Sequence, residues 1–120
     1  MSRFTSWSFA TVVAICAVAC AGAPKPEARL ASSEGAIRGA QEAGAAGVPQ
    51  ATLHLKYAQE QRDRAVELIA KGENHRANLM LARAEADAEL AVALSREAAA
   101  QVDATHAEES VQTLKNKDAQ

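Results

Sequence analysis

The sequence predicts an all-α protein. We expect either an alanine-rich antiparallel helical hairpin or a three-helix up-down-up bundle with a long third helix, preceded by a signal peptide. About a quarter of the 120 residues are alanine, which has the highest helix propensity. Small and apolar residues recur at heptad spacing in the second half of the chain. Glycine and proline separate these stretches, and no run of alternating β-branched residues indicates a strand after residue 26.

Residues 1–19 have the layout of a bacterial secretory signal. Arg3 provides a short positive region, and residues 9–19 are apolar or small apart from Thr11. This apolar run is about half as long as the roughly 20 residues that a membrane-spanning helix needs. The sequence therefore predicts a signal peptide that is removed, rather than a permanent transmembrane helix.

The residues before Cys20 resemble a lipobox, the motif in which a cysteine is acylated and becomes the first residue of the mature protein. Val18 and Ala19 fit the two positions before the cysteine, and Ala17 stands where the motif prefers Leu, Val or Ile. We predict lipidation of Cys20 and binding to the membrane through that lipid, because stable anchoring takes more than one acyl chain. Residues 20–26 would then be the lipidated cysteine and a short tether. The open alternative is cleavage after Ala19 without a lipid, which leaves a free thiol.

The first predicted helix covers residues 27–46. Glu34 and Arg38 are spaced for an i,i+4 ion pair. Gly35 and Gly39 form a G-x-x-x-G pattern, and among charged neighbours this pattern predicts close packing against a soluble helix rather than dimerisation in a membrane.

The second predicted helix covers residues 49–71 and lies between the breakers Pro49 and Gly72. A stripe of its residues, all small or apolar except Arg62, is spaced 4-3-4-3-4. The members of this stripe are Ala51, Leu55, Ala58, Arg62, Ala65 and Ile69. Heptad spacing of this kind predicts one face that packs against other helices.

The third predicted helix begins near Asn74 and reaches at least Val111. Its stripe keeps the heptad spacing over Ala77, Leu81, Ala84, Ala88, Ala91, Ser95, Ala98 and Val102. Alanine at these positions lets helices approach toward the short end of the usual 8–10 Å range. In an up-down-up arrangement this helix outruns its partners after about Ser95. We predict a helical domain over residues 27–115 and a disordered tail over 116–120. The predicted packing seam is Leu55, Ala58, Ala65, Ile69, Leu81, Ala84, Ala88, Ala91 and Ala98.

The sequence carries no motif for catalysis, and we predict no enzyme activity, no cofactor and no metal ligand. His54, His75 and His106 lie in different helical stretches, and none has a second metal ligand at catalytic spacing. Glu85 and Glu89 share a helix face, which we interpret as a solvated acidic stripe. The 13 basic and 15 acidic residues give a net charge of −2, which provides no basic field for nucleic acid.

The chain resembles a group of small alanine-rich bacterial lipoproteins that carry a helical domain of unknown function. The resemblance covers roughly residues 28–95. It rests on Ala36, Ala40, Gly44-Ala45, Pro49, Leu53, Ala58, Ala65, Gly72, Ala77 and the run from Leu81 to Ala91. Some members of the group continue into an OmpA-like peptidoglycan-binding domain, which this sequence lacks. The resemblance implies an envelope location and a helical hairpin or bundle, and it implies no activity.

A second resemblance is to the small helical murein lipoprotein, which links to peptidoglycan through a C-terminal lysine. This chain has Lys115 and Lys117 near its end but finishes at Gln120.

From these observations we expect a non-enzymatic lipoprotein of the bacterial outer membrane, facing the periplasm. Its helical domain would act as a tether or interaction module toward an envelope protein or peptidoglycan. One alternative is a self-assembling coiled-coil lipoprotein, that is, a homo-oligomer. Another is a periplasmic carrier of a small ligand or metal, which the scarcity of aromatic and clustered polar residues disfavours.

Overall fold

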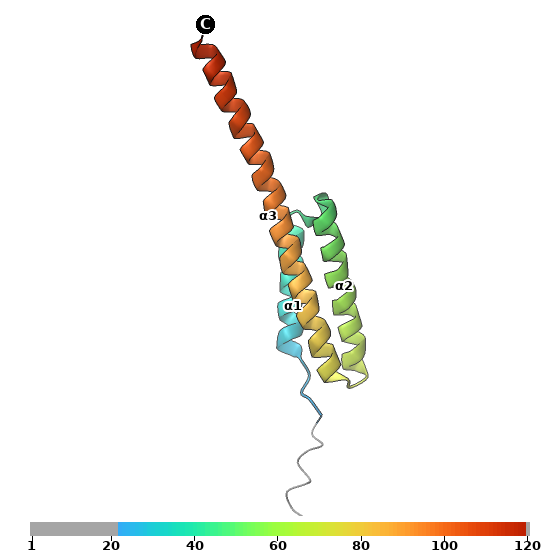
Figure 1. The fold of residues 1–120 in the computed structure, drawn as a ribbon. Helices are drawn as coiled ribbons and strands as arrows, with labels where there is room; N and C mark the ends of the chain where they lie inside the picture. Colours follow the sequence, from blue (N-terminus) through green and yellow to red (C-terminus); the bar gives the residue numbers. More distant parts are fainter. Residues whose placement is uncertain (1–21, 120) are drawn as a thin grey trace, which may run out of the picture.

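The computed structural model describes residues 22–119, and in this range the chain forms a three-helix bundle (Figure 1). The elements are α1 (Glu27–Glu42), the 3₁₀ turn η2 (Ala45–Gly47), α2 (Pro49–Ala70) and α3 (Asn74–Asp118). The helices run up, down and up, so the predicted all-α fold with a long third helix is confirmed. The predicted signal peptide and Cys20 lie outside the described residues.

The connection between α1 and α2 is built on a glycine. Gly44 has a φ of +80°, a left-handed conformation that other residues adopt at a cost. For this reason α1 ends at Glu42, four residues before the predicted end of the first helix. The Thr52 hydroxyl then donates to the carbonyls of Ala45, at 2.8 Å, and Val48, at 3.0 Å, and so fixes η2 to the first turn of α2.

The turn between α2 and α3 is a Schellman motif. Gly72 has a φ of +75°, and its N–H donates to the Ile69 carbonyl at 3.0 Å. The next N–H, that of Glu73, donates to the Leu68 carbonyl at 2.9 Å. These two bonds satisfy carbonyls at the end of α2 and reverse the chain into α3.

The core consists of two apolar clusters along the bundle axis. The larger comprises Ile37, Ala40, Ala45, Ala51, Leu55, Ala58, Ala88 and Ala91, and the smaller comprises Ala65, Leu68, Ala77 and Leu81. Within the predicted seam, Leu55, Ala58, Ala65, Leu81, Ala84, Ala88 and Ala91 are buried, while Ile69 and Ala98 are partly buried. On α2 the buried apolar residue near the end of the helix is Leu68, one position before the predicted Ile69.

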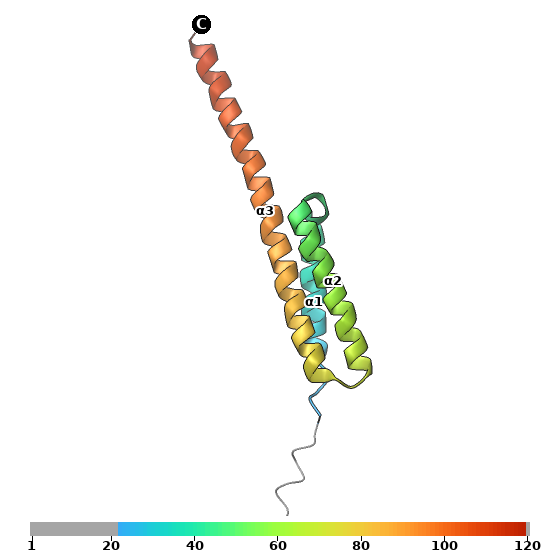
Figure 2. The ribbon, with the colours of Figure 1, turned by 45° about the vertical axis from the view of Figure 1, so that its right-hand side comes forward.

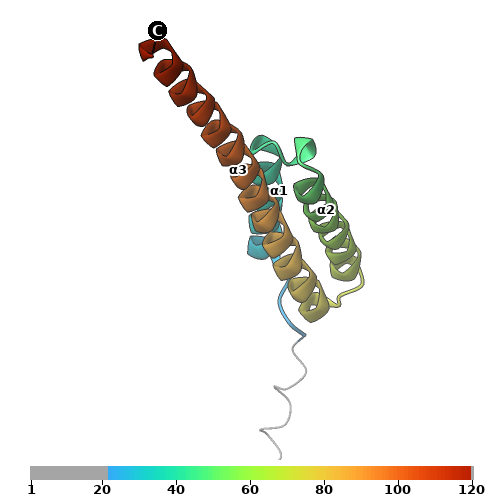
Figure 3. The ribbon, with the colours of Figure 1, turned by 45° about the horizontal axis from the view of Figure 1, so that its top comes forward.

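The third helix packs against both partners over its first half and then continues alone (Figures 2 and 3). Its last buried side chain is Ser95, whose hydroxyl donates to the Ala91 carbonyl at 2.8 Å. The prediction of a disordered tail from residue 116 differs from the structure, in which α3 continues through Asp118. Lys115 and Lys117 lie in its last turn, where their positive charges interact favourably with the negative end of the helix dipole.

The two glycines of α1 do not mark a close helix contact. A Cβ placed at Gly35 or Gly39 would meet no atom within 4 Å outside the local backbone. Within the described residues, therefore, this G-x-x-x-G pattern does not pack closely against a neighbouring helix. The residues of α1 that face the bundle are instead Ser33, Ile37 and Ala40, all of which are buried.

Glycine substitutions should separate the cost of the turn from ordinary helix propensity. Gly72→Ala should lower the free energy of unfolding by about 1 kcal/mol, because alanine is strained at positive φ. The methyl group itself would meet no atom within 4 Å, so no steric clash adds to this cost. Gly39→Ala is the matched control and should stabilise the fold by about 0.5–1 kcal/mol. Urea unfolding followed by helical circular dichroism measures both, and equal signs for the two variants would contradict this account.

Candidate functional site

Two carboxylates of α3 bind its two partner helices. Glu85 faces α1: its carboxylate accepts from the Arg29 guanidinium at 3.2 Å and from the Ser32 hydroxyl. Asp87 faces α2: it accepts from His54 Nδ1 at 2.8 Å and from Gln61 Nε2 at 2.7 Å. Side chains two residues apart on a helix point about 200° away from each other, and for this reason Glu85 and Asp87 reach different helices. Glu85 is thus an interhelical contact and not part of a solvated acidic stripe.

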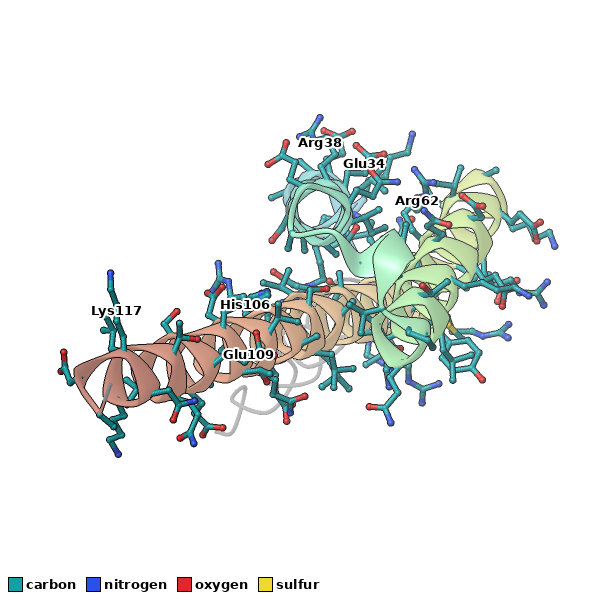
Figure 4. All side chains as sticks on the ribbon, turned by 90° about the horizontal axis from the view of Figure 1, so that it is seen from above. Glu34, Arg38, Arg62, His106, Glu109 and Lys117 are labelled. Carbon is teal, nitrogen blue, oxygen red and sulfur yellow. The ribbon has the colours of Figure 1, made fainter. Side chains whose placement is uncertain are left out.

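A third polar contact joins α1 to α2. Glu34 lies on the side of α1 toward Arg62 (Figure 4), and Arg62 Nη1 is 3.6 Å from the Glu34 carboxylate. The predicted i,i+4 partner of Glu34, Arg38, does not take part in this pair. Arg62 occupies a seam position of α2, and its side chain is 30% exposed. Its guanidinium therefore reaches the edge of the bundle between the two apolar clusters, where it also lies 2.7 Å from Asp63.

The histidines do not come together. His54 is bound to Asp87 and meets Tyr57 edge to face, with ring centroids 6.1 Å apart. His75 is exposed at the start of α3, and His106 lies 3.7 Å from Glu109 on exposed helix surface (Figure 4). Among residues 22–119 no group of three or more His, Cys, Asp or Glu side chains is placed to share a metal ion.

The sequence analysis missed the bond between His54 and Asp87, because 33 residues separate them and neither lies in a motif. The signal that would have found it is the helix geometry. Asp87 precedes the seam residue Ala88, and His54 precedes the seam residue Leu55. Each side chain therefore lies at the edge of its own packing face, where the two helices meet.

The most unusual feature is the part of α3 that extends beyond the bundle, residues 99–118, which we call the distal segment. All of its side chains are exposed. They include three sizeable apolar ones, Val102, Val111 and Leu114, which are 55%, 50% and 62% exposed. Most of the stability of a helix in a protein comes from packing of an apolar face, and the distal segment packs against no other part of the described chain. A helical distal segment with exposed apolar side chains is a candidate binding surface for another helix.

The N-terminal tether meets the bundle at the end opposite the distal segment (Figure 1). Residues 22–26 have no regular structure, and α1 follows them directly. The Asn74 amide, at the first turn of α3, donates to the Ala23 carbonyl at 2.6 Å. This bond holds the tether beside the beginning of α3, so the described chain enters at one end of the molecule and finishes at the other.

No helix within residues 22–119 combines the length and apolar character that crossing a membrane requires. No protein-family model, curated protein or solved structure matches the chain. The assignment of a role therefore depends on the tether, the bundle and the distal segment.

Removing the Asp87 carboxylate should destabilise the bundle although little apolar surface is lost. Asp87→Ala leaves His54 and Gln61 without their acceptor at a site about one quarter exposed. We expect a loss of about 1–2 kcal/mol, after a small gain in helix propensity. Glu108→Ala, in the distal segment, is the control and should change stability by less than about 0.5 kcal/mol. A double-mutant cycle with His54→Ala measures the coupling, and additive losses would show that the contact does not stabilise the fold.

Proposed function

We propose that the protein is a non-enzymatic lipoprotein of the bacterial outer membrane, facing the periplasm, whose helical domain is an interaction module. The observation that carries this proposal is the placement of the two ends. The tether enters beside the first turn of α3, and the distal segment projects from the opposite end. An acyl anchor at Cys20 would then hold one end of the rod at the membrane and present the other to a partner.

The dimensions suit this role. At 1.5 Å per residue, α3 is roughly 68 Å long, and the distal segment accounts for roughly 30 Å of it. Cys20 precedes Ala23 by three residues, so the lipid would be attached close to the bundle. The partner would be an envelope protein or peptidoglycan in contact with the exposed surface of α3.

A carrier of a small ligand is less well supported. The hollow between the tether and α3 is lined by charged and polar side chains, among them Lys25, Arg29 and Glu85. Two of these, Arg29 and Glu85, already form an ion pair at 3.2 Å. Pockets that bind small ligands are mostly apolar and enclose the ligand. The charged and polar lining of this hollow does not match that description.

Replacing the proposed lipid acceptor tests the anchor. Cys20→Ser should move the protein from the membrane fraction to the soluble fraction of the envelope, because the acyl chains that bind it to the bilayer are lost. Cys16→Ser, within the predicted signal, is the control and should leave the protein at the membrane. The intact mass of the native mature protein gives an independent readout. A mass equal to the unmodified polypeptide from Cys20 would contradict the proposal.

Shortening α3 tests the interaction surface. A chain that stops at Ala98 should keep a melting temperature within a few degrees of the full chain, because every buried side chain of α3 lies before that residue. The same truncation should abolish photocrosslinks to envelope components from a crosslinker placed at Leu90, an exposed side chain of α3 close to the distal segment. Unchanged crosslinks would show that the distal segment does not contribute to binding.

A further inference from the structure

The exposed side of α3 carries a second heptad stripe, on the face opposite the buried seam. Its positions up to Ala104 each lie two residues after a member of the first stripe of α3, a rotation of about 200°, and its last three positions continue the same spacing. The stripe comprises Leu79, Arg83, Ala86, Leu90, Ala93, Glu97, Ala100, Ala104, Ala107, Val111 and Leu114, and every one of these side chains is exposed. Only Arg83 and Glu97 are charged. The stripe runs without interruption from the bundle into the distal segment.

We propose that this stripe is a homodimerisation surface, and that two copies of the chain pair through α3 in antiparallel orientation, centred on Val102. In this register Leu90 faces Leu114 of the second copy, and Ala93 faces its Val111. The alanines at positions 100 and 104 face each other across the centre, where small side chains let two helices approach closely. The inference concerns the exposed face of α3 and does not require the lipid.

Charge complementarity favours the second copy as the occupant. The flanks of the stripe are acidic within the bundle, at Asp87 and Glu89, and basic at the end of the helix, at Lys115 and Lys117. In the antiparallel register the residues that flank the core pair along its two sides. Glu89 then lies beside Lys117 of the second copy on one side, and Asp87 lies beside its Lys115 on the other. The symmetry of a dimer makes each of these pairs twice. Since Asp87 already accepts two hydrogen bonds within its own chain, the pair between Glu89 and Lys117 is the one to test.

A parallel dimer through the same stripe is disfavoured by its charges. Parallel pairing places each core residue opposite its own copy, so Arg83 would face Arg83 and Glu97 would face Glu97. It would also place Asp103 of one copy beside Glu108 of the other. The antiparallel register instead sets Glu97 against Ala107 and leaves one like-charge contact, between the two copies of Asp103 at the centre.

The first test is disulfide crosslinking of the full chain in its membrane. Leu90→Cys and Leu114→Cys are made as two separate variants and produced together, and the linked peptides are identified by mass. We expect links between positions 90 and 114, because both residues are exposed and face each other in the antiparallel register. A link between two copies of position 90 overturns the antiparallel orientation. The absence of any link involving the introduced cysteines overturns the proposal that this stripe is the dimer interface.

The second test measures the dimer dissociation constant of the full chain by sedimentation in mild detergent. Glu89→Lys and Lys117→Glu should each weaken the dimer about five- to tenfold, and the double variant should return to within about twofold of the native value. Glu42→Lys, on α1, is the control and should change it by less than twofold. Asp103→Asn should tighten the dimer by removing the like-charge contact at the centre.

A native chain that stays monomeric at millimolar concentration would overturn the proposal, as would losses that the double variant does not restore. The lipid proposal stands or falls separately, on the intact mass and on Cys20→Ser. A monomer with an acylated cysteine would contradict the dimer proposal alone. A dimer with an unmodified cysteine would contradict the lipid proposal alone.

Discussion

The close approach of three helices along alanine is the constraint on which the rest of the structure depends. Most of the buried residues are alanines, and Leu81 is the largest side chain that is fully buried. Each alanine removes little apolar surface from water, so the hydrophobic contribution per residue is small. Polar side chains at the edge of the seam then bridge the helices. The seam therefore limits the stability of the bundle and permits the contacts that add to it.

Those polar contacts determine how α3 lies against its neighbours. An alanine seam has few large side chains that interlock, so it specifies the position of one helix along another only weakly. Glu85 and Asp87 remove this freedom, because one binds Arg29 of α1 and the other binds His54 of α2. Both pairs lie at the edge of the seam and are partly exposed, which keeps their desolvation cost low. The main effect of these two pairs is to fix the position of α3 relative to α1 and α2.

The sequence predicts the helices and the seam well because both depend on local rules. Alanine propensity, heptad spacing and the breakers Pro49 and Gly72 are enough to place three helices and to show that the third outruns the others. The errors come where tertiary geometry decides. The end of α1 depends on a left-handed glycine, and the pairing of Glu34 with Arg62 depends on which helices are adjacent.

The polar contacts of α3 illustrate the same limit. Glu85, taken on the sequence alone, belongs to an acidic helix face, because nothing local indicates that Arg29 will lie opposite it. Its partner lies 56 residues away and becomes a neighbour only once α1 and α3 pack together. The second stripe of α3 differs, since its spacing is visible in the sequence. The spacing alone does not distinguish this stripe from the seam, which lies two residues out of phase, and its exposure in the fold is what separates the two.

The proposed membrane anchor and the proposed antiparallel dimer constrain each other through geometry. In a dimer centred on Val102, the first turns of the two α3 helices are roughly 84 Å apart, because 28 residues separate Asn74 from Val102 in each copy. The tethers leave from these two ends. If both lipids enter one membrane, the dimer has to lie along its surface, whereas a single anchored chain is free to project. In the proposed dimer the distal segment of each copy is covered by the other, so dimerisation and binding of a different envelope partner along this stripe exclude each other.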